Sequence, residues 1–181
     1  METYIALLRG INVAGQKKMP MAILREHFEQ WGFTAVQTYI QSGNIIFKYP
    51  TKSPEEIAET IQQKIQTTYG FEVPVMVIRP ARLEKILANN PFIADKDPKR
   101  IYLTFLSAIP AVDHVQALTS QDFAPEEYSI VEQHIYFFSP QNYGRAKMNN
   151  NFFEKKLKVN ATTRNWRTSN KLLEMAHLAA D

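Results

Sequence analysis

The chain has 181 residues, of which 45% are hydrophobic and 12% aromatic, and a net charge of +3. This composition is typical of a globular protein with one large core or two small ones, and it excludes a disordered chain. Cysteine is absent, which excludes disulfides and thiolate metal sites, and the sequence shows neither a signal peptide nor the roughly 20 apolar residues of a membrane span, so we expect a cytoplasmic protein with no membrane partner.

The first half of the sequence predicts the order strand, helix, strand, strand, helix, strand, with strands at 4–11, 36–41, 45–49 and 73–78. The first strand is apolar almost throughout, which is typical of a strand covered on both faces. One helix begins at Pro20 and ends at Gly32. The other follows Ser53, whose spacing to Glu56 predicts a capping box, and ends at Gly70. Apolar side chains at helical spacing are Ile23, Leu24, Phe28 and Trp31 in the first helix and Ile57, Ile61 and Ile65 in the second.

The second half predicts the same order, with strands at 101–106, 128–131, 135–138 and 161–166. Helical spacing marks its two helices at 112–118 and 151–158, and a helix at 80–89 connects the halves. Thr168 is the predicted cap of a last helix, which carries Leu172, Leu173, Ala176 and Leu178. Strand, helix, strand, strand, helix, strand is the ferredoxin-like order.

We therefore predict an α+β fold of two tandem ferredoxin-like (βαββαβ) halves with a C-terminal helix. Residues 1–79 form the first half, 80–100 a connecting helix and loop, and 101–181 the second half with the last helix. In such a unit, the loop after the first strand and the hairpin between the second and third strands share one edge of the sheet. In this sequence those segments are 9–18 and 41–44.

These two segments carry the first candidate binding site. A basic loop in front of a helix N-terminus suits an anion such as a phosphate or a carboxylate, because its N–H groups and the helix dipole favour negative charge. The predicted ligand-binding side chains here are Arg9, Asn12, Lys18, Gln41, Ser42 and Asn44. The alternative is structural: Arg9 pairs with a carboxylate, and Ser-Gly-Asn at 42–44 is simply favourable turn chemistry.

A second candidate site lies in the basic segment 141–171, which carries eight Lys and Arg residues and one Glu, and hence a charge of +7. Such a block attracts phosphates or nucleic acid, or it forms a solvated face that keeps the protein in solution. Within it, Arg164 and Asn165 can bind the planar edges of a base. The alternative gives this segment a structural role, with Trp166 as a core anchor ahead of the cap Thr168.

Catalytic and metal-binding patterns are missing from the sequence. The four histidines show no metal-ligand spacing, Asp95 and Asp97 alone do not make a cation site, and no serine lies in a nucleophile elbow. We therefore predict no metal and no cofactor, name no catalytic residue, and leave open whether the protein is an enzyme.

Motifs along most of the chain point to one family. They are LRGINV at 8–13, YIQSGN at 39–44, NPF at 90–92 and TRNW at 163–166. In this order they resemble the signature of the bacterial DUF1697 family, a domain of unknown function. The family pattern usually has a second glycine where this chain has Ala14. The resemblance implies a cytoplasmic bacterial α+β protein and brings no established activity, substrate or cofactor.

The leading hypothesis is a protein that binds a phosphate-bearing ligand, either a nucleotide or a nucleic acid, at a basic, Asn-rich site. One alternative is an enzyme that acts on a small anionic substrate at the shared sheet edge, where donors would stabilise charge. The other alternative is a structural or interaction protein without a small ligand, for example a dimer formed through an exposed sheet edge. The sequence does not distinguish a monomer from a dimer.

Overall fold

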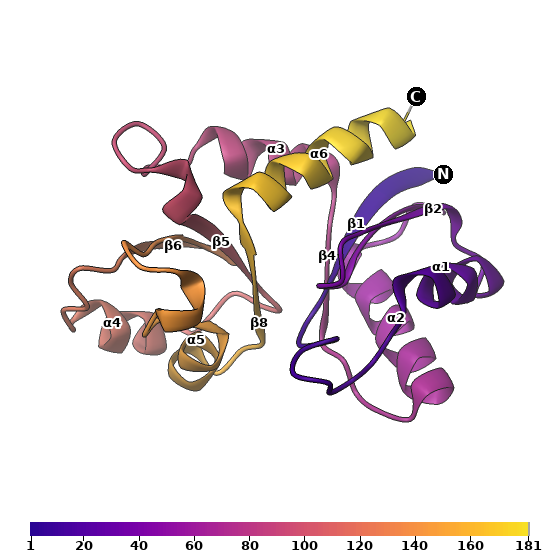
Figure 1. The fold of residues 1–181 in the computed structure, drawn as a ribbon, viewed down its shortest axis with the longest axis horizontal. Coiled ribbons are helices and arrows are strands. Elements are labelled where there is room, and N and C mark those ends of the chain that lie inside the picture. The colour runs from indigo at the N-terminus through magenta and orange to yellow at the C-terminus, as the bar shows by residue number, and fades with distance from the viewer. Residues whose placement is uncertain (181) are drawn as a thin grey trace. The chain divides into compact units, whose positions relative to one another are not determined.

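A computed structural model describes residues 1–180, and this part of the chain contains six α-helices and two four-stranded antiparallel sheets (Figure 1). The strands are β1 (Glu2–Leu8), β2 (Thr34–Tyr39), β3 (Asn44–Tyr49), β4 (Val75–Ile78), β5 (Ile101–Leu106), β6 (Glu127–Val131), β7 (His134–Phe138) and β8 (Ala161–Asn165). The helices are α1 (Met21–Gln30), α2 (Pro54–Tyr69), α3 (Pro80–Ala88), α4 (Val112–Thr119), α5 (Asn150–Leu157) and α6 (Trp166–Ala180), with short 3₁₀ helices η1 (Pro98–Arg100) and η2 (Tyr143–Arg145). The predicted α+β class is confirmed.

The chain divides into two compact units. The first contains Met1–Ile86 and the residues from Asn170 onward, and the second contains Leu87–Ser169. Helix α3 therefore begins in the first unit and ends in the second, and α6 does the reverse. The predicted domain limits at 1–79, 80–100 and 101–181 stay a prediction, because compactness alone does not define which segments fold as one domain.

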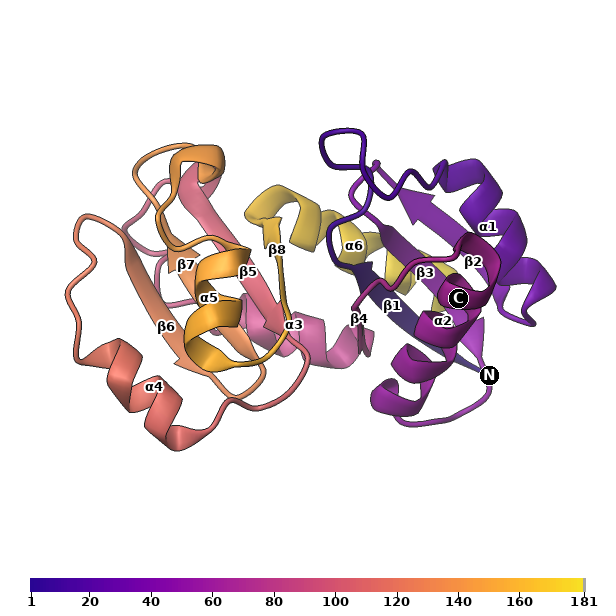
Figure 2. The same cartoon turned by 90° about the horizontal axis from the view of Figure 1, so that it is seen from below.

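In the first unit the strands follow the order β2-β3-β1-β4, and β1 pairs antiparallel with both β3 and β4. Strand β1 is buried from Tyr4 to Leu8, which confirms that it is a covered strand. Helices α1 and α2 lie on the same face of this sheet (Figures 1 and 2). The core on that face joins Tyr4 and Leu8 to Phe28 of α1 and Ile61 of α2, so the centre of the unit is apolar and its loops carry the polar chemistry.

Helix α1 begins at Met21 and ends at Gln30, two residues before the predicted end. Its buried stripe is Met21, Leu24 and Phe28. This spacing turns Ile23 toward solvent, where it is 46% exposed. No side chain caps the N-terminus of α1, and its first turn contains no acidic residue, so that end of the helix keeps an uncompensated positive dipole.

Helix α2 begins with the predicted capping box. The hydroxyl of Ser53 accepts the N–H of Glu56 at 3.2 Å, and the carboxylate of Glu56 accepts the N–H of Ser53 at 3.1 Å. The backbone hydrogen bond from Ser53 lowers the pKa of Glu56 most, with a further contribution from the Ser53 hydroxyl. The helix ends at Gly70, whose φ of 76° confirms the predicted left-handed cap.

In the second unit the strands follow the order β6-β7-β5-β8, and β5 pairs antiparallel with both β7 and β8. Its core joins Ile135 and Phe137 of β7 to Leu118 of α4 and to Phe153 and Leu157 of α5. The strands β6 and β8 form the two edges of this sheet. The two sheets thus repeat one strand order, each with helices packed on it.

Candidate functional site

The loop between β1 and α1 is held in one path by its own hydrogen bonds. The carboxamide oxygen of Asn12 accepts the N–H of Met19 at 2.8 Å, and its Nδ2 donates to the carbonyls of Met19 at 3.0 Å and Gln41 at 2.9 Å. The ammonium of Lys17 donates to the carbonyl of Glu72 at 2.6 Å. The loop is therefore tied to itself, to the β2–β3 hairpin and to the segment before β4.

The β2–β3 hairpin packs directly against the end of β1. The N–H of Leu8 donates to the carbonyl of Gly43 at 2.8 Å. A Cβ at Gly43, whose φ is 81°, would lie 2.7 Å from the Cβ of Leu8, so the position requires glycine. Asn44 is fully buried, and its Nδ2 donates to the carbonyl of Tyr39 at 2.9 Å and to the hydroxyl of Ser42 at 3.0 Å. The loop and the hairpin meet at one edge of the sheet, as predicted.

The loop backbone enters the left-handed region repeatedly. Positive φ angles occur at Gly10 (71°), Asn12 (54°), Ala14 (49°), Gly15 (76°) and Lys17 (44°). A left-handed conformation costs a non-glycine residue about 1–2 kcal/mol, and Asn tolerates it best. Hydrogen bonds hold Asn12 and Lys17 in place, so this unusual path is fixed before any ligand arrives.

The tip of the loop presents main-chain donors. Val13 and Gln16 form an antiparallel bridge, and within residues 1–180 the N–H groups of Ala14 and Gly15 between them donate to no protein acceptor. Lys18 follows on the same loop with an exposed side chain. A run of N–H groups on a turn beside a cation is a recurrent way to bind an anion.

The predicted side chains of the first unit divide by what they do. The carboxamide groups of Asn12 and Asn44 hydrogen-bond the backbone and hold it in place. The hydroxyl of Ser42 accepts a hydrogen bond from Asn44. The structural alternative considered for the Ser-Gly-Asn turn therefore describes it well. Of the predicted side chains here, Lys18 and Gln41 are exposed, Arg9, Asn12 and Ser42 are half-buried, and Asn44 is buried.

Arg164 and Asn165 belong to the second unit, whereas the other predicted site residues belong to the first. Arg164 is only 6% exposed, and its Nη1 donates to the hydroxyl of Thr162 and the carbonyl of Thr163, both at 2.9 Å. The side-chain oxygen of Asn165 accepts the N–H of Thr168 at 2.8 Å. Asn165 is thus the cap of α6, and the prediction that Thr168 caps this helix is wrong, because Thr168 already lies in its first turn.

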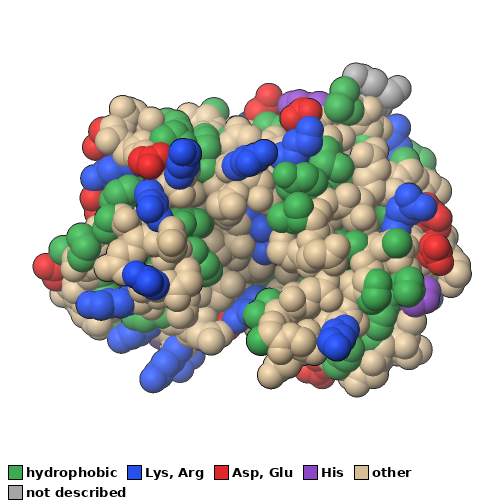
Figure 3. Space-filling view, viewed as in Figure 1, with side chains coloured by type: hydrophobic (Ala, Val, Ile, Leu, Met, Phe, Trp, Pro, Cys, Tyr) green, Lys and Arg blue, Asp and Glu red, His purple; other side chains and the backbone are tan. Residues whose placement is uncertain are grey.

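Most of the basic segment 141–171 belongs to the second unit, which ends at Ser169. Its exposed cations are Arg145, Lys147, Lys155, Lys158 and Arg167. Figure 3 shows Lys and Arg side chains at the lower left, over the region that contains α5. Lys155 and Lys156 occupy the last turn of α5, where the helix dipole favours cations, so helix stability explains part of this charge.

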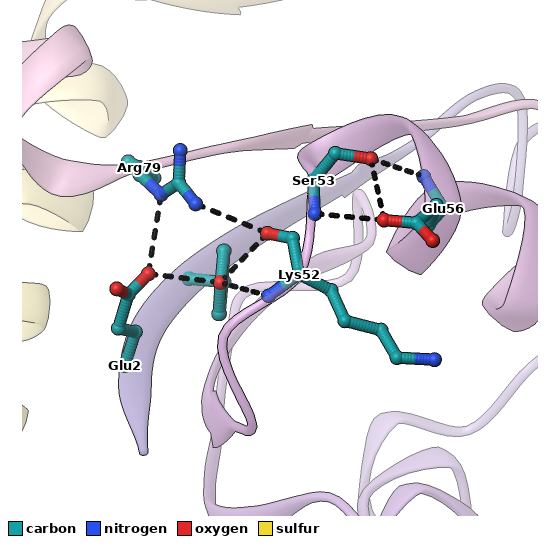
Figure 4. A network of polar contacts seen from close by, with 6 residues as sticks. Glu2, Lys52, Ser53, Glu56 and Arg79 are labelled. Carbon is teal, nitrogen blue, oxygen red and sulfur yellow. Dashed lines mark hydrogen bonds and ion pairs between the residues drawn. The ribbon is translucent and has the colours of Figure 1, made fainter.

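A polar network that the sequence did not predict lies at the start of β1 (Figure 4). The hydroxyl of Tyr4 donates to the carboxylate of Glu2 at 2.9 Å and accepts the N–H of Lys52 at 3.2 Å. Arg79 contacts the same carboxylate at 3.2 Å and donates to the carbonyl of Lys52 at 3.0 Å. The Tyr4 hydroxyl lowers the pKa of Glu2 most, and Arg79 lowers it further. Lys52 and Arg79 lie too far from Glu2 and Tyr4 in the chain for any local pattern to reveal this network. Its polar groups bond to one another.

Metal binding, membrane insertion and the histidines were also considered for the described residues. No group of three or more His, Asp or Glu side chains between residues 1 and 180 lies in an arrangement that could hold a metal ion. None of the described helices has the length and apolar character needed to cross a membrane. The ring of His27, which is half-buried, hydrogen-bonds the hydroxyl of Tyr69 at 2.8 Å, and His134 is buried edge-on against Tyr136.

Comparison with known proteins gives a family and a similar fold. Residues 1–136 match the family described as "Protein of unknown function (DUF1697)", which confirms the resemblance seen in the motifs. A solved structure, that of the conserved bacterial protein SP0830 from Streptococcus pneumoniae, is similar to 96% of this chain and 98% of its own, with 27% sequence identity and a TM-score of 0.77. No curated protein matches the chain.

Proposed function

Because the chain belongs to the DUF1697 family of proteins of unknown function, we propose a role from the geometry of its first unit. The loop 9–20 binds a phosphate-bearing ligand, either a nucleotide or a nucleic acid. One observation carries this proposal: the N–H groups of Ala14 and Gly15 have no acceptor within the described residues, on a loop whose path is fixed by hydrogen bonds. Phosphate oxygens are the acceptors that such N–H groups bind most strongly.

The charges around the loop support the same ligand. Lys18 is exposed, Arg9 is half-buried, and the N-terminus of α1 that follows carries no capping side chain and no carboxylate. A phosphate at this place would gain from both cations and from the helix dipole. A neutral ligand would gain nothing from them.

The proposed site differs from the Asn-rich site expected from the sequence. Asn12 and Asn44 hold the backbone of the loop and the hairpin, and among the predicted amide side chains of this unit Gln41 is the exposed one. An Asn44→Ala variant is therefore a poor test of binding, since its first effect falls on a fully buried hydrogen-bond centre. Lys18 is the better probe, because its side chain is exposed and makes no hydrogen bond or ion pair within residues 1–180.

The test is a thermal-unfolding series with a nucleoside monophosphate, a nucleoside triphosphate and a single-stranded RNA. A ligand at about 100 times its dissociation constant should add about 2.7 kcal/mol of stability. Lys18→Gln should weaken binding about tenfold, because one charge-assisted contact is lost. If only the RNA binds, and its affinity falls steeply with salt, the ligand is the nucleic-acid backbone.

Lys64→Gln is the matched control. Lys64 is an exposed lysine of the same unit, on α2, away from the loop in sequence. This variant should bind like the wild type. Equal binding by wild type and Lys18→Gln, or the absence of stabilisation by any of the three ligands, would contradict the proposal.

We also propose that each unit is a ferredoxin-like domain. The orders β2-β3-β1-β4 and β6-β7-β5-β8 are the same order counted within each unit, and both follow a strand, helix, strand, strand, helix, strand sequence. Limited proteolysis that cuts first within 80–100 would support the predicted domain limits. A first cut inside β5 or β6 would contradict them. The cytoplasmic location stays a prediction.

A further inference from the structure

The second unit carries a groove of about 580 Å³ along the edge strand β6. Four consecutive residues of β6, 127–130, line it. Val115 and Thr119 of α4 line one side, and Phe92 lines the other. Phe92 contacts the ring of Phe138 on β7. Phe137, the preceding residue of β7, points to the opposite face of the sheet and belongs to the core under the helices. The groove therefore follows the sheet edge, with α4 on one face of the sheet and Phe92 on the other.

The main chain of β6 directs hydrogen-bonding groups into this edge. The N–H of Leu106 donates to the carbonyl of Gln133 at 2.9 Å, so His134 turns its own N–H and C=O toward β6. Alternation along the regular β6–β7 pairing then points the N–H and C=O of Tyr128 and Ile130 away from β7. Within residues 1–180 neither of these two N–H groups has an acceptor.

The charge of the groove is negative. Asp122, Glu126 and Glu127 line it, and no Lys or Arg does. Lys96 pairs with Glu127 from outside the lining. The carboxylate of Glu126 accepts two backbone N–H groups, at 2.9 and 3.0 Å, which hold it in place and leave its charge unneutralised by a cation. The side chains of Phe92, Phe123 and Tyr128 add aromatic surface to the lining.

From these features we propose that the β6 edge binds an extended peptide segment of a partner protein, with Lys or Arg among its side chains. The peptide adds as a further strand of the β6-β7-β5-β8 sheet and hydrogen-bonds the main chain of Tyr128 and Ile130. Its basic side chains lie near Asp122 and Glu126, and their stems cover the aromatic rings. Strand addition supplies affinity through the backbone, and the carboxylates select the sequence.

The test uses the full chain and a blocked hexapeptide in which lysine and valine alternate. Titration followed by amide NMR should shift and protect the N–H signals of Tyr128 and Ile130, with smaller changes in α4. The same peptide with N-methylated valines lacks half of its main-chain donors and should bind at least tenfold more weakly. A peptide with glutamate in place of lysine should not bind.

Asp122→Asn tests the charge without removing the hydrogen bond that this side chain accepts from the N–H of Ala124. It should weaken the lysine peptide about three- to fivefold. Asp113→Asn, an exposed position on α4 outside the groove, is the control and should bind like the wild type. The proposal is overturned if the β6 amides do not respond to the lysine peptide, if the N-methylated peptide binds equally well, or if the β6 signals change only with protein concentration, which would assign this edge to a second copy of the chain.

Discussion

Strands β2 and β6 hold the same place in the two units, yet they present different edges. The pairing of β2 with β3 shifts between Thr34 and Gln37, and Ala35 there has a φ of 50°. The pairing of β6 with β7 is continuous from Glu127 to Val131. A bulge disrupts the row of donors and acceptors that an added strand would need. One topology thus produces an edge that is protected in the first unit and available in the second.

The hairpins that follow these strands differ as well. In the first unit the turn depends on Gly43, which presses against β1. In the second unit the turn contains no glycine, and Glu132 adopts a φ of 50° instead. The first turn is specified by close packing, whereas the second turn tolerates a residue that is unfavourable for its conformation.

The largest predicted effect is the loss of this packing. Gly43→Ala should lower the free energy of unfolding by about 3 kcal/mol, because the new methyl group must displace Leu8 and Ile11 while the residue keeps a φ of 81°. Urea unfolding followed by circular dichroism measures it. The counterpart Glu132→Gly should instead be neutral or stabilising by up to about 1 kcal/mol.

Gly144→Ala is the control for this experiment. A Cβ at Gly144 would meet no atom within 4 Å, and its φ is not positive. Its unfolding free energy should stay within about 0.5 kcal/mol of the wild type. If Gly43→Ala were as mild as this control, close approach of the hairpin to β1 would not be what fixes the first turn.

Helix and strand positions follow from the sequence wherever one local pattern dominates. The capping box at Ser53 and the left-handed cap at Gly70 mark α2 correctly, and β5 occupies its predicted residues 101–106. Other ends were predicted less well. Strand β1 stops at Leu8 rather than continuing to the predicted 11, because the chain turns at Gly10, whose φ is 71°, and leaves the β3 ladder.

The sequence predicted where the candidate site lies, but not which of its side chains face a ligand and which hold the backbone. The meeting of the loop with the hairpin follows from strand order. The sequence does not reveal that Asn12 turns inward, because its partners at Met19 and Gln41 become neighbours only when the chain folds. No motif in the sequence indicated the β6 groove, because an open sheet edge depends on strand order and regular pairing.

A smaller loss of stability is expected from removing the N-cap of α6. Asn165→Ala should lower the free energy of unfolding by about 1 kcal/mol, because the N–H of Thr168 loses its acceptor at the start of α6. Asn165→Asp keeps an acceptor and should be close to neutral. Thermal unfolding distinguishes the two variants. If Asn165→Ala left the free energy of unfolding unchanged, Asn165 would not be the residue that caps α6.

The caps also predict a difference in pH dependence between the units. The α2 cap includes the carboxylate of Glu56, whereas α5 is capped by the amide of Asn149. The pKa of Glu56 is lowered from its ordinary 4.5 by the Ser53 backbone hydrogen bond. Its stabilisation is therefore present above about pH 4.5 and disappears as the pH falls through the lowered folded-state pKa.

Glu56→Gln should accordingly be less stable than the wild type near neutral pH, and the difference should shrink in acid. Urea midpoints measured at both pH values check this. Glu55→Gln is the control, because Glu55 makes no hydrogen bond to Ser53. A difference that persists unchanged in acid would show that the charge of Glu56 has no part in the cap.

The smallest predicted effect tests whether the strained loop of the first unit is tuned for stability. Ala14 has a φ of 49° and no hydrogen bond holding it there. Ala14→Gly relieves about 1 kcal/mol of left-handed strain and loses part of it to the greater freedom of unfolded glycine, so we expect a gain of about 0.5 kcal/mol. Lys158→Gly, at the left-handed C-cap of α5 in the second unit, should gain at least as much. Should Ala14→Gly be destabilising instead, its methyl group must make contacts that hold the loop, and the anion site would then depend on a side chain at 14 as well as on its N–H group.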